Sequence, residues 1–215
     1  IFYTQAYAAE AEGIQFPLEQ AYFLAVSNYF NARDYVNTIR TVDTCLRIAP
    51  ETELAPKLLL YRGLSESAQL RYADARRSYQ QVIAADPASN EAVIAYTQLG
   101  KSHLDEKHYA EAIRSFDALM AGDRSKLDTS EVHYFLGLSH YGLNAFPEAI
   151  RHLEQVEPTS AYYPFTFARI TRAAVQQKDF AGAAAYLDRA EQAARKDTIV
   201  SLPFIRLARA ELFSA

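Results

Sequence analysis

The stretch LRYADARRSYQQVIAADP, residues 70–87, decides the fold because its pattern recurs at a fixed spacing along the chain. Steps of 37 residues, with a last step of 34, align Tyr72 with four other aromatic residues: Tyr35, Tyr109, Phe146 and Phe180. The same steps align Ala75 with residues that are also small: Thr38, Ala112, Ala149 and Ala183. Such a period indicates a helical solenoid, because each helix pair leaves an apolar face that only the next pair can bury.

The repeated positions resemble those of the tetratricopeptide repeat family. The pattern is most complete in the third repeat, where it reads Tyr96, Leu99, Gly100, Tyr109, Ala112 and Phe116. Gly63 and Gly137 stand in register with Gly100. The resemblance implies an all-α fold, a right-handed superhelix of stacked antiparallel helix pairs. It also implies a scaffold for protein–protein interaction, with the first helix of each pair lining a concave face.

The repeats divide the chain into three parts that we expect to form one continuous array. Residues 17–197 are predicted to form five repeats. Residues 1–16 read as a helix of a preceding repeat or as an N-terminal cap. Residues 198–215 read as the first helix of a sixth repeat or as a C-terminal cap. In the second repeat Arg62 and Glu66 occupy positions that are usually apolar, and their spacing of four predicts a pair on one helix.

Helix geometry and the family register together predict which side chains face the concave groove. Positions three before and one after the register glycines share a face, as do residues one turn further along the helix. The candidate partner-binding residues are Phe23, Phe30, Leu60, Leu64, Lys101, Tyr134, Leu138, Tyr141, Phe165 and Arg172. We expect an apolar and aromatic groove that binds a peptide or helix of a partner protein. The alternative is that neighbouring helices cover several of these residues.

Family members that bind a C-terminal carboxylate use a clamp of Lys, Asn and Arg at such positions. Lys101 and Arg172 are isolated in separate repeats here, so this clamp is absent. A second class of function stays open, in which the chain is an assembly component that acts through its ends, its convex face or self-association. The apolar segment around Leu202, Phe204 and Leu212 favours burial of the last helix, either by further repeats or by a second copy of the chain.

Composition excludes several other classes of function. The formal net charge is −4 and the basic residues are scattered, so nucleic acid is not an expected partner. Cys45 is the single cysteine, which rules out a disulfide within one chain, and its repeat position predicts burial. The sequence has no phosphate-binding loop and no nucleophile or zinc-protease motif, so we predict no enzyme, no cofactor and no metal.

Five histidines leave one further possibility open. His133 and His140 share a helix face, and His103 occupies the repeat position equivalent to His140, so three imidazoles could gather on adjacent helices. No Cys, Asp or Glu completes a ligand set at matching spacing, which favours a structural role for these histidines.

The location of the protein stays open between the cytoplasm and the bacterial periplasm. No run of eighteen apolar residues and no basic-then-apolar leader is present, so direct membrane insertion is not expected. The chain begins at Ile1, which indicates either a removed leader or a piece of a longer protein. The 37-residue repeat around Asp86, Pro87 and Tyr96 resembles repeats of bacterial envelope proteins, but many cytoplasmic members share it.

Overall fold

The computed structural model describes residues 18–122, 127–196 and 202–213, and within these ranges the only regular secondary structure is helical. The N-terminal helix expected within residues 1–16 lies outside the described residues. The chain divides into two compact units, residues 1–102 and residues 103–215.

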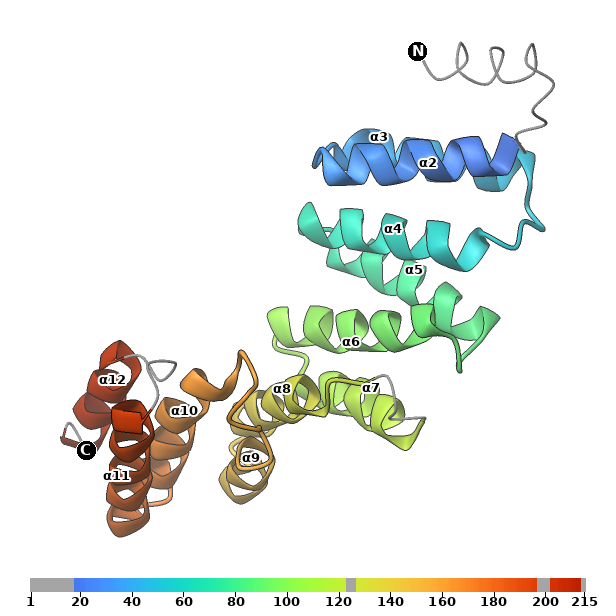
Figure 1. Ribbon diagram of the computed structural model, residues 1–215. Helices are drawn as coiled ribbons and strands as arrows, with labels where there is room; N and C mark the ends of the chain where they lie inside the picture. Colours follow the sequence, from blue (N-terminus) through green and yellow to red (C-terminus); the bar gives the residue numbers. More distant parts are fainter. Residues whose placement is uncertain (1–17, 123–126, 197–201, 214–215) are drawn as a thin grey trace. The chain divides into compact units, whose positions relative to one another are not determined.

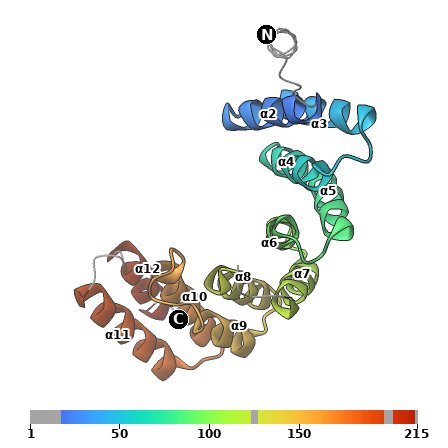
Figure 2. The same ribbon diagram turned by 45° about the vertical axis from the view of Figure 1, so that its right-hand side comes forward.

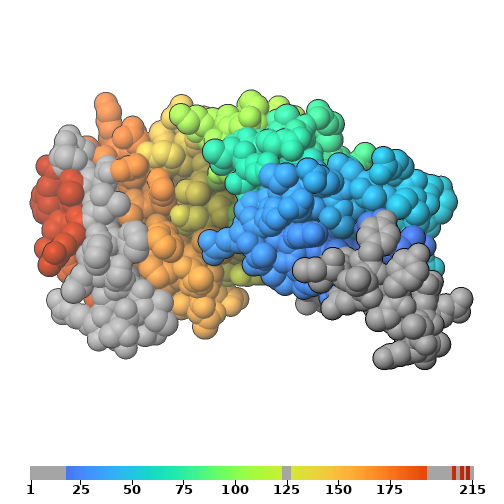
Figure 3. All heavy atoms as spheres, turned by 90° about the horizontal axis from the view of Figure 1, so that it is seen from above, coloured from blue at the N-terminus to red at the C-terminus, as the bar shows by residue number. Residues whose placement is uncertain are grey.

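The first unit is built from helices that pack in sequence order. They are α2 (Leu18–Asn31), α3 (Tyr35–Ile48), α4 (Ala55–Ala68), α5 (Tyr72–Ala85) and α6 (Asn90–Asp105), of which residues 90–102 belong to this unit. Helices α2 and α3 lie side by side, as do α4 and α5 (Figure 1, Figure 2). Helix α4 contacts both α2 and α3, and the space-filling view shows these helices, blue to teal, in direct contact (Figure 3).

The second unit continues the same arrangement. Its helices are α7 (Tyr109–Ala121), α8 (Thr129–Gly142), α9 (Phe146–Leu153), α10 (Tyr163–Gln176), α11 (Phe180–Lys196) and α12 (Leu202–Phe213). Each helix from α7 to α10 packs against its successor, and α12 packs against both α10 and α11. Among the described residues, no helix is long and apolar enough to cross a membrane.

Register glycines bring the two helices of a pair into close contact. A Cβ atom on Gly63 would lie 2.5 Å from Cε1 of Tyr79, whose ring is fully buried. A Cβ atom on Gly137 would lie 2.6 Å from Cγ of Leu153 and 3.2 Å from the carbonyl oxygen of Ala149. Both contacts lie far inside van der Waals distance, so the pairs α4–α5 and α8–α9 require glycine at these positions.

The turn inside each helix pair has the same backbone conformation. One residue per turn has a φ angle between 58° and 62°: Arg33, Leu70, Lys107, Asn144 and Lys178. In the second repeat, the N–H of Leu70 donates to Ser67 and the N–H of Arg71 donates to Glu66. This left-handed cap satisfies carbonyls at the end of the helix and recurs at the steps of 37 and 34 residues that the aromatic positions predicted.

The predicted pair between Arg62 and Glu66 is wrong in detail, because Ser78 of α5 lies between the two side chains. Nε of Arg62 donates to the Ser78 hydroxyl at 3.0 Å, and that hydroxyl donates to Glu66 at 2.7 Å. Arg62 forms its ion pair with Asp43 of α3, at 3.2 Å. Burial raises the pKa of Glu66, against the opposing effect of the Ser78 hydrogen bond. The network joins α3, α4 and α5, which spacing on one helix does not reveal.

Candidate partner-binding site

Four of the ten predicted groove residues line one pocket of the first unit. Phe23 and Phe30 come from α2, and Leu60 and Leu64 come from α4. The pocket has a volume of about 430 Å³ and continues to the first turns of α6. We call it the apolar pocket. It joins the first helices of three successive repeats.

Aromatic contacts hold the walls of the apolar pocket. The Tyr61 ring meets Phe23 edge-on at a centroid distance of 5.9 Å and Phe30 at 5.1 Å. Phe30 also packs edge-on against Tyr35 of α3, at 5.8 Å. Edge-to-face pairs add to the stabilisation that burial alone provides, so these rings are held in defined positions. Leu60 is only 9% exposed and forms the base of the wall rather than its rim.

The polar rim of the apolar pocket lies at the N-terminal ends of two helices. Lys57 belongs to the first turn of α4, and Asn90 and Glu91 open α6. Ile94, which is 43% exposed, follows them one turn later on α6. The pocket is therefore polar at one end and apolar along the remainder, which suits a partner side chain that is bulky and apolar.

Sequence reasoning missed Lys57, Tyr61, Asn90, Glu91 and Ile94 as members of the site. A signal for two of them was present, because Ile94 lies 37 residues after Lys57 and both lie one turn before register positions. The predicted register reaches one turn further toward the C-terminus of each helix and not toward the N-terminus. Tyr61 gave no such signal, because it follows Leu60 directly in the sequence and does not occupy a predicted groove position.

Two predicted residues of the second unit, Tyr134 and Phe165, lie close together. Tyr134 is 8% exposed, stacks on Tyr162 at 5.0 Å and lies 6.4 Å from Phe165 between ring centroids. Phe165, 38% exposed, is the most accessible of these rings. Burial and the hydrogen bond to Glu131 raise the pKa of Tyr162, so its hydroxyl remains protonated as the donor.

Leu138 is half-buried on α8 and packs against the buried cluster that contains Tyr134, Leu153 and Ile170. The remaining predicted residues lie at separate places. Tyr141, also on α8, meets the Phe146 ring edge-on at 5.4 Å. Lys101 is half-buried on α6 and Arg172 is half-buried on α10.

Three imidazoles do gather in the second unit, but the third is His152 and not His103. Nδ1 of His152 lies 3.1 Å from Nδ1 of His133, and the His152 ring stacks on His140 at 5.2 Å. In the described ranges, no group of three or more His, Cys, Asp or Glu side chains is arranged to hold a metal ion.

Residues 97–164 match the family described as Tetratricopeptide repeat. This segment is a tetratricopeptide repeat region. No curated protein matches the chain. Among solved structures, a crystal structure of MamA superposes with a TM-score of 0.73 at 19% identity, covering 86% of this chain and 96% of that chain.

Two further structures show the same fold. MamA 41-end from Desulfovibrio magneticus RS-1 has a TM-score of 0.70 at 17% identity, with 85% of this chain and 98% of that chain covered. PilW, a type IV pilus biogenesis factor, has a TM-score of 0.63 at 15% identity, with 93% and 94% covered. The predicted all-α solenoid of tetratricopeptide repeats is thereby confirmed.

Proposed function

We propose that the chain is a protein–protein interaction scaffold that binds a peptide or helix of a partner through the apolar pocket. The observation that supports it is the joining of Phe23, Phe30 and Leu64 with the exposed Ile94 in one hollow. Buried apolar side chains contribute about 1.5 to 3 kcal/mol each, so one anchoring residue in this pocket supplies much of the affinity of a short segment.

The partner is a protein segment with a bulky apolar anchor and few charges. The pocket walls are aromatic and aliphatic, and its polar groups are confined to the rim that Lys57, Asn90 and Glu91 form. A highly charged segment would lose hydration there without finding enough partners. An extended or helical peptide with one aromatic or leucine anchor matches these walls.

The test uses a photo-crosslinking amino acid at position 94, which lies on the pocket rim. Cross-linked partners are identified by mass spectrometry, and the cross-linked segment is made as a peptide for affinity measurement. Ile94→Glu places a charge in the apolar pocket and removes an apolar contact, so we expect at least tenfold weaker binding, or about 1.4 kcal/mol.

The matched control is Leu24→Glu, because Leu24 is 47% exposed on α2 and does not line the apolar pocket. This variant should bind as the parent does, and both variants should keep the parent's far-UV circular dichroism. Equal affinity of the Ile94→Glu variant and the parent would refute the proposal.

The second candidate function is assembly of copies through the last helix. Phe213 of α12 is 79% exposed, although the same helix packs Ile205 and Leu212 inward. That surface is separate from the apolar pocket in sequence, so its test is independent of the test at position 94.

A further inference from the structure

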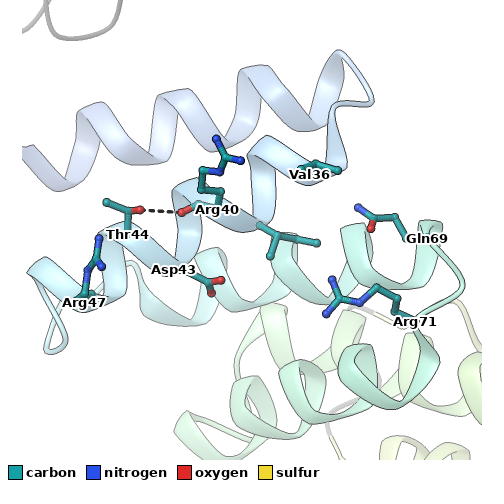
Figure 4. A pocket seen from close by; sticks show the side chains of 8 residues that line it. Val36, Arg40, Asp43, Thr44, Arg47, Gln69 and Arg71 are labelled. Carbon is teal, nitrogen blue, oxygen red and sulfur yellow. Dashed lines mark hydrogen bonds between the residues drawn. The ribbon is translucent and has the colours of Figure 1, made fainter.

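A second pocket of the first unit is lined by arginine side chains rather than by apolar ones. It has a volume of about 690 Å³ and lies between α3 and the turn that joins α4 to α5. Arg40, Asp43 and Arg47 come from α3, and Arg71 comes from the turn. Figure 4 shows Arg71 reaching from that turn toward α3. We call this hollow the arginine pocket.

The carboxylates near the arginine pocket are already engaged. Asp43 accepts a hydrogen bond from Arg62, which lies outside the lining of the pocket. Asp74 accepts hydrogen bonds from Arg71 and from Arg77, so one carboxylate is shared by two guanidinium groups. The region therefore carries an excess of positive charge although the formal net charge of the chain is −4.

Two guanidinium groups of the arginine pocket are available for a ligand. Arg40 and Arg47 are exposed, and within the described residues neither guanidinium forms a hydrogen bond or an ion pair, while Asp34, whose carboxylate is bonded to Asn37, interacts with the charge of Arg40. Thr44 lies between them and donates its hydroxyl to the backbone carbonyl of Arg40, so this hydrogen bond does not involve the Arg40 guanidinium. Free guanidinium groups recognise carboxylates through paired N–H donors.

The spacing of the arginines decides the class of ligand. Arg40 and Arg47 are seven residues apart on α3, which corresponds to about 10 Å along one helix face. Carboxylates seven residues apart on a partner helix have the same spacing, so each can pair with one arginine without either side chain bending toward the other. Val36, one turn before Arg40, is 61% exposed and lines the same hollow, so it offers an apolar contact to that partner helix.

We propose that the arginine pocket binds an acidic helical segment of a partner protein. The partner's carboxylates pair with Arg40 and Arg47, and an apolar residue one turn away packs on Val36. A long polyanion such as nucleic acid fits less well, because Asp43 lies between the two arginines and would repel the phosphates of a continuous row. The surface is distinct from the apolar pocket, and its binding does not depend on the function proposed above.

The test measures the binding of a blocked, alanine-rich helical peptide that carries two glutamates seven positions apart and a leucine one turn beyond each. Fluorescence anisotropy with the whole chain should show binding that weakens as salt is raised. A peptide with glutamine in place of both glutamates should bind at least tenfold more weakly. The double variant R40E/R47E should lose binding of the acidic peptide by at least tenfold.

The matched control is K107E/K178E, which makes the same change of charge at two exposed residues of the second unit. It should bind the acidic peptide within twofold of the parent. The proposal is overturned if the parent does not bind the acidic peptide, if the glutamine peptide binds equally well, or if R40E/R47E and K107E/K178E lose equal affinity. Equal binding of a single-stranded DNA of matched charge, or displacement of the peptide by millimolar inorganic phosphate, would also overturn it.

Discussion

The protonation of His152, in the second unit, depends on the residues around its ring. Its ring lies between His133, which it meets through Nδ1 atoms 3.1 Å apart, and His140, on which it stacks. Desolvation, followed by the nearby His140 and His133, lowers the pKa of His152 to about 4. Desolvation also lowers the pKa of His140, although Glu148 and Asp117 oppose that change. His140 and His152 are therefore neutral at pH 7.

This cluster predicts that the folded chain loses stability as the pH falls below about 6.5. The unfolded chain binds a proton at His152 near its ordinary pKa of 6.5, whereas the folded chain resists it until the pH approaches 4. One such proton is worth at most about 1.4 kcal/mol per pH unit, and the water that reaches this half-buried ring reduces the effect. Thermal melts between pH 7.5 and 5.5 should show a falling melting temperature.

The substitution His152→Gln isolates the contribution of this ring, because glutamine does not titrate. The variant should show a shallower dependence of melting temperature on pH than the parent. His108→Gln changes an exposed histidine at the start of α7 and serves as the control. If the parent, His152→Gln and His108→Gln show the same slope, the cluster does not control stability in this range.

At the scale of the element, the turn inside each helix pair contains a strained left-handed residue that the sequence does not reveal. Glycine and asparagine are the usual residues of the left-handed conformation, yet four of the five such turns here use Arg, Leu or Lys. A residue with a Cβ atom is disfavoured there by about 1 to 2 kcal/mol. The hydrogen bonds of the cap, and the packing of both helices, maintain the conformation.

Leu70→Gly should therefore stabilise the chain. Leu70 has a φ angle of 60° and is 71% exposed, so glycine relieves strain while removing little buried surface. The greater freedom of glycine in the unfolded chain offsets part of the gain, which leaves about 0.5 to 1 kcal/mol and a rise in melting temperature of about 2 °C. Leu70→Ala keeps the strain and should melt at or below the parent. A glycine variant that melts below the alanine variant would contradict this account.

Elements also show what the sequence could predict and what it could not. The repeated aromatic and small residues correctly predicted which helices pair. The reason is steric: at Gly63 and Gly137 the partner helix comes so close that a Cβ atom would clash with it. The prediction of the apolar pocket was incomplete, because Tyr61 and Asn90 join its lining only where three repeats stack. The burial of Tyr134 could not be read from its own repeat either, since its ring stacks on Tyr162 of the following repeat. To predict contacts between repeats, one must know the distances between their helices, and a repeat pattern does not give these distances.

At the scale of the whole molecule, the chain presents several surfaces to other chains. The apolar pocket and the arginine pocket belong to the first unit, and α12 belongs to the second. One side of α12 packs inward, where Ile205 joins a cluster with Phe167 and Leu187, and Arg209 forms an ion pair with Glu191 of α11. The exposed Phe213 extends the apolar character of this helix to its surface.

We propose that α12 mediates contact between copies of this chain. An exposed aromatic residue beside half-buried Leu212 offers an apolar surface that a second copy can cover. Phe213→Glu places a charge on this surface without disturbing the inward packing of Ile205. Light scattering coupled to size exclusion, at concentrations from about one to one hundred micromolar, should show that the parent self-associates and that Phe213→Glu does so at least tenfold more weakly.

The Ile94→Glu variant is the matched control for this measurement, because it makes the same kind of change on an exposed apolar residue of α6. It should self-associate as the parent does, since Ile94 lies in the apolar pocket and not on α12. A parent that is monomeric over the whole concentration range would show that α12 is not a contact between copies. If α12 forms the contact, only Phe213→Glu should weaken self-association. Equal weakening by Phe213→Glu and Ile94→Glu would instead assign the association to general surface hydrophobicity.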